Sequence, residues 1–204
     1  MSACPPGLSG TLWPIHPKPL ADELLSCWLI RIARGFGTTA ERFCRQVWSE
    51  TVWKGDIDVD PGEHVLRVLA ARTGTAYKDV AGMTLAAYER RLSAPLATLF
   101  DEAAAGKRLR FCGVCLQEDA LPYYRREWRL SFTAVCARHG TPLLSNCGGC
   151  GRIVDVERIP LDAESLAVCF ACGGKIYEKG GAIQRSDRMA RLMAFERRLC
   201  RVLG

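Results

Sequence analysis

The motif FCGVC (residues 111–115) is the first of four short motifs in the second half of the chain; VCARH (135–139), NCGGC (146–150) and VCFAC (168–172) follow it. In each motif two residues separate a cysteine from a second cysteine or a histidine, so both side chains of one tight turn can point at the same ion. Two such pairs complete a tetrahedral shell of sulfur and nitrogen ligands. The motifs therefore predict two structural Zn²⁺ ions held by eight ligands, which are Cys112, Cys115, Cys136, His139, Cys147, Cys150, Cys169 and Cys172.

The order of the pairs leaves two arrangements open. In the sequential arrangement the first two pairs form a Cys3His site and the last two form a Cys4 site, with 20 and 18 residues between the pairs of each site. In an interleaved arrangement Cys112 and Cys115 join Cys147 and Cys150. Sequential pairing closes shorter loops at a lower cost in chain entropy, and we favour it. The alternative is that the cysteines are buried and free and that their spacing is a coincidence. A coincidence could explain one pair, but four consecutive pairs favour metal binding.

The chain of 204 residues contains 11 cysteines, an odd number. No apolar export signal or membrane span is visible, so we expect a reducing, cytoplasmic location, in which metal binding is favoured over disulfides. Apolar residues make up 49% and charged residues 25% of the sequence, which fits one or two soluble globular domains. Cys27 and Cys44 fall on or beside apolar helical stripes and are interpreted as small core residues.

The first half of the chain has the apolar periodicity of helices. Apolar residues recur at intervals of three and four from Leu24 to Ile32 and predict a helix over residues 22–34. Thr38 and Glu41 have the spacing of a capping box, which predicts the start of a second helix.

A third helix start is indicated by Asp60 as N-cap, followed by Pro61 at the first helical position, and Gly74 is typical of its end. Short helices are expected over residues 76–81 and 84–93. Their spacing about Gly74 is similar to that of a helix-turn-helix, although ordinary helical hairpins have the same spacing.

The character of the sequence divides the chain into three parts. We expect a helical domain over residues 1–106, a tandem zinc-binding domain over residues 107–180 with the Cys3His site first, and a basic C-terminal helix over residues 181–204. The β-prone run 152–156 indicates small β elements in the zinc-binding part. The expected fold class is mainly α, with a helix-turn-helix-like N-terminal domain, tandem zinc fingers with small zinc-ribbon β elements, and the C-terminal helix.

Motifs of several enzyme classes are missing from the sequence. It contains no Gly-x4-Gly-Lys-Ser/Thr phosphate loop, no His-Glu-x2-His and no carboxylate cluster of the kind that metal-dependent nucleases need. Each predicted zinc site is closed by four protein ligands, whereas a catalytic zinc keeps one position for water. We therefore expect no enzymatic activity. A metalloenzyme with an incomplete zinc shell is a weaker alternative.

Basic residues are concentrated between residues 107 and 204, where 17 Lys and Arg stand against 10 Asp and Glu. Arginines beside aromatic residues can bind phosphates and stack on bases. The aromatic residues Tyr123, Tyr124, Trp128 and Phe132 are instead interpreted as a small core that covers the zinc. The basic residues remain candidates for contacts with nucleic acid or with a protein partner; they are Lys107, Arg108, Arg110, Arg125, Arg126, Arg129, Arg188, Arg191 and Arg198.

Several segments between residues 13 and 173 stand in the order that one known family shows. They are Pro17-x-Pro19, DELLSCWLIRIA from Asp22 to Ala33, Leu69 to Gly74, Met83 to Leu85, Arg110 to Leu116, Tyr124 to Trp128, Cys136 to Gly140 and Leu143 to Cys150. In this order they resemble the TniQ family of transposition target-selection proteins. The chain is similar to short members, without the C-terminal regions by which longer relatives recognise a specific DNA site.

The resemblance implies a helical N-terminal part with helix-turn-helix character, tandem zinc fingers and no enzymatic activity. It implies an adaptor that recruits an AAA+ ATPase regulator, and through it the transposase, to a chosen DNA target. Short members are similar to those that cooperate with an RNA-guided CRISPR effector complex. The expected partners are therefore an AAA+ transposition ATPase, target DNA and a CRISPR effector with its guide RNA, with no membrane; a homodimer stays open. The alternative function is an independent zinc-ribbon transcriptional regulator that reads DNA with its N-terminal helices.

Overall fold

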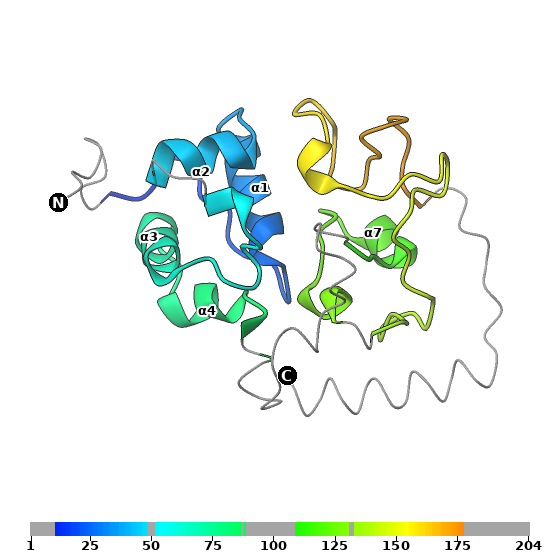
Figure 1. Ribbon diagram of the computed structural model, residues 1–204, viewed down its shortest axis with the longest axis horizontal. Coiled ribbons are helices and arrows are strands. Elements are labelled where there is room, and N and C mark those ends of the chain that lie inside the picture. The colour runs from blue at the N-terminus through cyan, green and yellow to red at the C-terminus, as the bar shows by residue number, and fades with distance from the viewer. Residues whose placement is uncertain (1–10, 49–51, 87, 89–108, 131–132, 178–204) are drawn as a thin grey trace. The chain divides into compact units, whose positions relative to one another are not determined.

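The computed structural model describes residues 11–48, 52–86, 88, 109–130 and 133–177. The chain forms two compact units, Met1–Ala87 and Tyr88–Gly204 (Figure 1). The described part is mainly helical, and its β structure consists of isolated β-bridges. The predicted C-terminal helix, most of the predicted helix over residues 84–93 and the predicted boundary at residue 106 lie outside the described residues.

The core of the first unit is built on α1 (Leu25–Gly35), whose residues Leu29 and Ile32 are fully buried. Cys27 and Cys44 are buried in the same unit, as the sequence predicted. The helix begins three residues later than predicted, because Asp22 has a positive φ of 57° and Leu24 is extended with a ψ of 141°. Neither conformation is helical, so the chain turns before the helix starts.

Polar groups along α1 form hydrogen bonds with the extended segment before it. Arg31 donates from Nε to Glu23 Oε1 and from Nη2 to Glu23 Oε2, both at 2.8 Å, and Nη2 also donates to the carbonyl of Lys18 at 2.8 Å. The indole Nε1 of Trp28 donates to the carbonyl of Pro17 at 2.7 Å. The buried Asp58, from the loop before α3, accepts two hydrogen bonds from the first turn of α1.

The second helix is α2 (Ala40–Trp48), which packs against α1. The predicted capping box is wrong by one residue: Thr39 Oγ1, not Thr38, accepts a hydrogen bond from the backbone N–H of Arg42, at 3.3 Å. Because the helix begins at Ala40, Thr38 lies one position too early to reach the free N–H groups of the first turn. Glu41 forms an exposed ion pair within the helix instead of reaching back.

The third helix, α3 (Glu63–Thr73), also begins later than the sequence predicted. Asp60 is not its N-cap: Asp60 Oδ1 accepts from the backbone N–H of Gly62 at 3.3 Å and closes a turn before the helix. Gly62, with a φ of 78°, takes the N-cap position, so Pro61 lies outside the helix. The positive φ breaks the helical path between the predicted cap and the first turn.

The end of α3 is the predicted one. Gly74 has left-handed backbone angles (φ 59°, ψ 33°) and terminates the helix. Lys18 Nζ donates to the carbonyls of Thr73 at 2.7 Å and Gly74 at 3.0 Å, which places a positive charge at the helix C-terminus. After three residues α4 (Tyr77–Gly82) follows and packs against α3, within one residue of the predicted range 76–81.

The second unit contains α7 (Gly113–Glu118) and two 3₁₀ turns, Arg126–Arg129 and Val156–Arg158. The β-prone run 152–156 does not become a strand: Ile153 forms one isolated bridge with Asn146, and the 3₁₀ turn follows. The carboxylate of Asp155 accepts from the backbone N–H of Glu157 at 3.0 Å and turns the chain out of the extended conformation.

Aromatic side chains form the core of the second unit. Phe111, Tyr124 and Trp128 are at most 1% exposed and contact one another edge to face, with ring centroids 6.5 Å and 6.3 Å apart. The hydroxyl of Tyr124 donates to the carbonyl of Leu166 at 3.2 Å, so the same core reaches the chain before the last cysteine pair. This confirms the interpretation of Tyr124 and Trp128 as core residues; Phe132 lies outside the described residues.

Candidate metal centres

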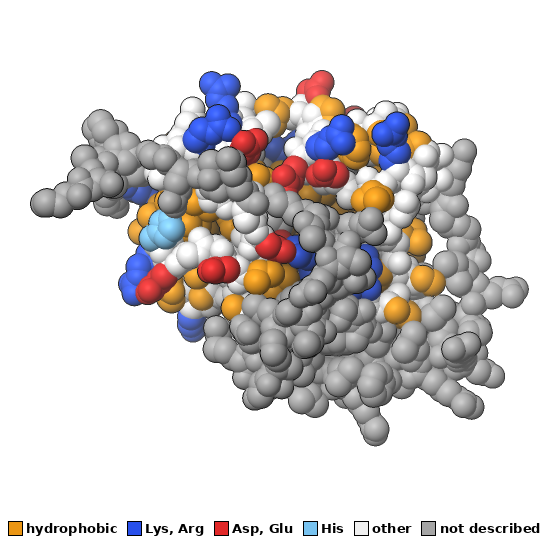
Figure 2. Space-filling model, viewed as in Figure 1, with side chains coloured by type: hydrophobic (Ala, Val, Ile, Leu, Met, Phe, Trp, Pro, Cys, Tyr) orange, Lys and Arg blue, Asp and Glu red, His pale blue; other side chains and the backbone are white. Residues whose placement is uncertain are grey.

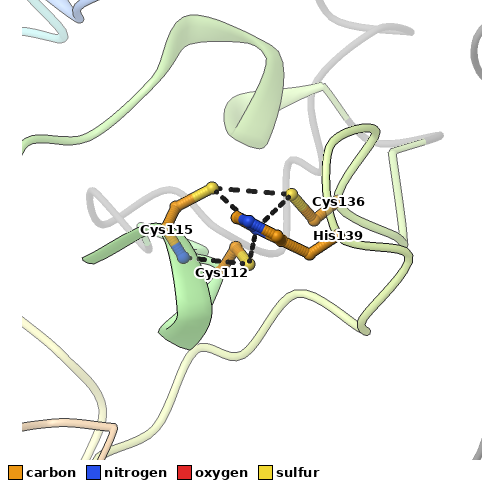
Figure 3. Close-up of side chains that lie close together, drawn as sticks. All are labelled: Cys112, Cys115, Cys136 and His139. Atoms are coloured by element: carbon orange, nitrogen blue, oxygen red, sulfur yellow. Dashed lines mark hydrogen bonds between the residues drawn. The ribbon is translucent and has the colours of Figure 1, made fainter. Parts of the chain in front are cut away.

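The first two pairs meet in one cluster, whose four ligand atoms lie within 4.8 Å of one another (Figure 3). Cys112 lies directly before α7 and Cys115 lies in its first turn. His139 points its Nδ1 into the cluster, at 3.4 Å from Cys112 Sγ, 3.2 Å from Cys115 Sγ and 3.7 Å from Cys136 Sγ. The sulfurs of Cys115 and Cys136 are 3.6 Å apart. This cluster could hold one metal ion.

The last two pairs form a second cluster, whose four sulfurs also lie within 4.8 Å of one another. Cys147 Sγ is 3.8 Å from Cys172 Sγ, and Cys150 Sγ is 3.6 Å from Cys169 Sγ. All four are free thiols, and those of Cys150 and Cys172 belong to exposed residues. The structure thus groups the eight side chains sequentially, as Cys3His and Cys4, and not in the interleaved arrangement.

The size of both clusters fits a metal ion with thiolate ligands. Zinc–sulfur distances are about 2.3 Å, which places two sulfurs of a regular tetrahedron about 3.8 Å apart. The sulfur–sulfur distances quoted above, 3.6 Å to 3.8 Å, are close to this edge length. A disulfide would need about 2.05 Å, so the thiols are spaced for a central ion and not for cross-links.

Three of the four pairs share one backbone turn. In each, a glycine directly after the second ligand has a positive φ and donates its N–H to the carbonyl of the first cysteine. A Cβ would strain this left-handed conformation, which explains why glycine occupies it. The three turns run from Cys136 to Gly140 (φ 67°, 2.8 Å), from Cys147 to Gly151 (φ 72°, 2.9 Å) and from Cys169 to Gly173 (φ 71°, 2.9 Å).

The first pair is built differently. The chain after Cys112 continues into α7, and the N–H of Leu116 donates to the carbonyl of Cys112 at 3.1 Å. The N–H of Cys115 points at Cys112 Sγ, at 3.4 Å, as does the N–H of Ala171 at Cys169 Sγ, also at 3.4 Å. The N–H of Cys115 contributes to the lowered pKa of Cys112 and so favours the thiolate form that a metal needs.

Without an ion, the packed thiols disturb one another's ionisation. Hydrogen bonding to the sulfur of Cys112 raises the pKa of the Cys115 and Cys136 thiols, while the pKa of Cys112 itself is lowered, chiefly by the hydrogen bond with Cys115. The backbone N–H of Gly174 lowers the pKa of Cys172, but the surrounding thiols outweigh it and raise this pKa to about 11. A divalent cation would remove this conflict, because it stabilises every thiolate at once.

Arg125 is largely buried inside the second unit. Its Nη2 donates to Asp119 Oδ1 and Oδ2, at 2.8 Å and 3.0 Å, and only 11% of its side chain is exposed. Its guanidinium lies over the rings of Tyr123 and Trp128, 4.3 Å and 4.8 Å from their centroids. Arg125 therefore supports the core, and reaching a phosphate would require breaking the buried ion pair.

The other basic candidates divide into three groups. Arg110 donates from Nη1 to the carbonyl of Thr133 at 2.7 Å and from Nη2 to the carbonyl of Leu130, so it also supports the fold. Arg126 and Arg129 are half-buried on the 3₁₀ turn that follows Arg125. The remaining candidates lie outside the described residues; they are Lys107, Arg108, Arg188, Arg191 and Arg198.

Charge on the displayed face is mixed. Figure 2 shows Lys and Arg side chains interspersed with Asp and Glu on the displayed face, not gathered into one patch. From Ser145 to Tyr177, around the Cys4 cluster, the chain has three basic and four acidic side chains. Four thiolates and one divalent ion would add two further negative charges there. The Cys4 region is therefore poorly suited to a phosphate backbone.

Sequence reasoning missed two residues that support these structures. Glu118, at the end of α7, lies 3.0 Å from His139 Nε2, and Asp58 caps α1 from a distance. Glu118 could have been found from the sequence, because it lies three residues after Cys115, the spacing of neighbours on one helix face. Asp58 could not, because its hydrogen-bond partner Ser26 is 32 residues away in the sequence.

These features define a helical protein with two candidate metal centres on cysteine-rich turns. The sequence model of the TniQ family matches residues 14–143, more than half of the chain. The chain therefore belongs to the TniQ family, as its motif order predicted, and the family indicates a role associated with transposition. No curated protein matches the chain. None of the described helices is long and apolar enough to cross a bilayer.

The family match ends between the two clusters. The Cys3His cluster lies inside residues 14–143, and the Cys4 cluster follows it. The polar residues of the motif before and along α1, which include Glu23, Ser26 and Arg31, form hydrogen bonds within the first unit. This family motif in the first unit thus has a structural explanation.

Proposed function

We propose that the chain is a non-catalytic adaptor in DNA transposition, with two structural zinc ions, that links recognition of a target site to an AAA+ ATPase regulator and the transposase. The observation that carries this proposal is the TniQ family match over residues 14–143. Target recognition would use DNA, an RNA-guided CRISPR effector, or both.

The donor sets support zinc as the metal. Cysteine sulfur and histidine nitrogen in a four-ligand cluster are the ligands of structural zinc sites. Both clusters are closed by protein ligands, and no carboxylate replaces a ligand in either. A hydrolytic zinc would need a position for water and a base beside it. The closed shells therefore support a structural role for the ions and argue against the metalloenzyme alternative.

Charge and burial support a proposed assignment of surfaces to partners. Arg110 and Arg125 are engaged inside the second unit, and the region around the Cys4 cluster is acidic once its thiolates are counted. Arg126 lies over the ring of Tyr88, 5.8 Å from its centroid, and is also engaged within the second unit. We therefore assign the Cys4 region to a protein partner, and DNA contact to the basic candidates outside the described residues.

The arrangement of helix-turn-helix and tandem zinc fingers belongs to the same proposal. Helices α3 and α4 are joined by a three-residue turn, which has the spacing of the motif. However, α4 has six residues, fewer than two turns, whereas a recognition helix places several residues along the major groove. The short α4 gives little support to the independent transcriptional regulator, which would read DNA with its N-terminal helices; most of the helix predicted over residues 84–93 lies outside the described residues.

The test is an assembly experiment with the purified full chain, the AAA+ ATPase encoded nearest to it, ATP and duplex DNA. We expect a complex that contains both proteins and that requires the zinc-loaded chain. Binding of the chain alone to DNA should be weak and should fall steeply with salt. A defined footprint on genomic DNA without any partner, together with no complex with the ATPase, would overturn the adaptor and favour the regulator.

A further inference from the structure

His139 uses both nitrogens of its imidazole ring. Nδ1 points at the three sulfurs of the Cys3His cluster, and Nε2 lies 3.0 Å from Glu118 Oε2. A neutral imidazole has one proton, and a nitrogen that ligates a metal cannot carry it. With Nδ1 turned to the cluster, the proton belongs on Nε2, which then donates to the carboxylate of Glu118.

We propose that Glu118 is the positioning residue of the Cys3His centre, and that its hydrogen bond to His139 holds the ring with Nδ1 toward the metal. A carboxylate behind a ligating histidine fixes the tautomer and the orientation of the ring and makes the ligating nitrogen more basic. This inference rests on the proposed binding of zinc at the Cys3His cluster.

The local structure gives Glu118 a fixed place. Glu118 is the last residue of α7, and Cys115 lies three residues earlier in the same short helix. Residues three apart share one face of a helix, so α7 supplies both a ligand and the carboxylate behind another ligand. Arg138, next to His139 in the chain, forms an ion pair from Nη2 to Glu118 Oε2 at 2.8 Å, the same oxygen that faces His139 Nε2, and so also holds the carboxylate in place.

The exposure of the pair makes the proposal testable. The side chain of Glu118 is 46% exposed and that of His139 is 14% exposed. Replacing a half-exposed carboxylate removes little packing, so an effect on metal affinity would not come from unfolding. The Cys4 cluster contains no histidine and serves as a control site within the same molecule.

The experiment measures zinc affinity of the full chain by competition with a chromophoric chelator, for the natural sequence and for Glu118→Ala, Glu118→Gln and Glu164→Ala. We expect Glu118→Ala to lower the affinity for one of the two zinc ions by about tenfold to a hundredfold and to leave the affinity for the other unchanged. Glu118→Gln keeps an acceptor oxygen and should lose less. Glu164 is exposed and lies five residues before Cys169, and Glu164→Ala should change the affinity for neither ion.

A spectroscopic measurement separates positioning from a general effect on folding. The chain has three histidines, so ¹⁵N spectra of the zinc-loaded protein can assign both ring nitrogens of His139. We expect Nδ1 to be metal-bound and Nε2 to be protonated, with this signature weakened in Glu118→Ala.

Two results would overturn the proposal: Glu118→Ala that binds both ions as tightly as the natural chain, or a His139 that binds the metal through Nε2. A natural chain that takes up no zinc at the Cys3His cluster would instead contradict the proposed metal centre itself. The two failures are therefore distinguishable.

Discussion

Asp58 accepts two hydrogen bonds from Ser26, one from the backbone N–H to Oδ1 at 2.7 Å and one from the hydroxyl to Oδ2 at 2.8 Å. Ser26 lies in the first turn of α1, and Leu24 at the N-cap has no side-chain acceptor to offer. The buried carboxylate of Asp58, 32 residues from Ser26 in the sequence, thus caps the N-terminus of α1. It also places a negative charge at the positive end of the helix.

Replacing Asp58 by alanine should therefore destabilise the first unit. The change leaves a buried N–H and a buried hydroxyl without an acceptor, at a cost of about 2 kcal/mol. Urea denaturation monitored by tryptophan fluorescence measures the loss. Glu41→Ala is the matched control, because it removes an exposed carboxylate from α2 and should cost less than about 0.5 kcal/mol. Equal stability of the two variants would contradict the capping role.

The pair of Arg31 and Glu23 offers a second test, with a control inside the same unit. The side chains of Arg31 and Glu23 are 9% and 0% exposed, whereas those of Arg45 and Glu41 are 61% and 56% exposed. Arg31→Ala leaves a buried carboxylate uncompensated, so we expect a loss of about 3 kcal/mol.

The control is Arg45→Ala, which breaks a pair at the same distance of 2.8 Å. Because that pair is exposed to solvent, the change should cost less than about 0.5 kcal/mol. Chemical denaturation of both variants measures the difference. A loss below about 1 kcal/mol for Arg31→Ala would show that burial adds nothing to this ion pair.

Removing the metal should unfold the second unit and spare the first. In the described residues 109–130 and 133–177 the regular structure consists of α7, two 3₁₀ turns and isolated bridges, so we expect much of the order there to depend on the ions. Each structural zinc contributes on the order of 10 kcal/mol. Hydrogen exchange after treatment with a strong chelator should show lost protection in these residues, with α1 and α3 still protected.

Adding zinc back should restore the protection, which controls for irreversible damage by the chelator. Unchanged protection of residues 109–177, once metal analysis confirms that the ions are gone, would contradict a structural role for them.

Gly173 and Gly174 form a matched pair for the turn of the last cysteines. Gly173 has a φ of 71°, where an added Cβ meets no neighbour within 4 Å, so its cost is purely conformational. Gly173→Ala should therefore weaken zinc binding at the Cys4 cluster, by the cost of about 1 to 2 kcal/mol of a left-handed alanine. Gly174 has an ordinary φ, and an added Cβ would lie 3.7 Å from Cys172 Sγ, a normal contact.

Gly174→Ala should accordingly bind zinc like the natural chain in the same chelator competition. If both variants bind equally tightly, the left-handed turn is not required. If both bind weakly, crowding near the sulfur, and not backbone conformation, limits this position.

Features that depend on neighbours in the chain were predictable. The ligand pairs, the glycine that ends α3 and the helical periodicity of α1 and α4 each follow from residues within one or two turns of one another. The helix starts were predicted less well, at Asp22, Thr38 and Asp60, because several polar residues near each start could have served as the cap. The backbone angles of Asp22 and Gly62 decided where two of these helices begin.

The sequence by itself determined which eight side chains form the two candidate metal clusters and which family the chain belongs to, because both depend on short spacings and their order along the chain. Only the tertiary structure decided that Asp58 caps α1, that Glu118 stands behind His139 and that Arg125 is buried between two rings. The physical reason for Asp58 and Glu118 is sequence separation, because their partners are 32 and 21 residues away. For Arg125 the reason is burial, which decides whether a charged side chain contacts a partner or belongs to the core.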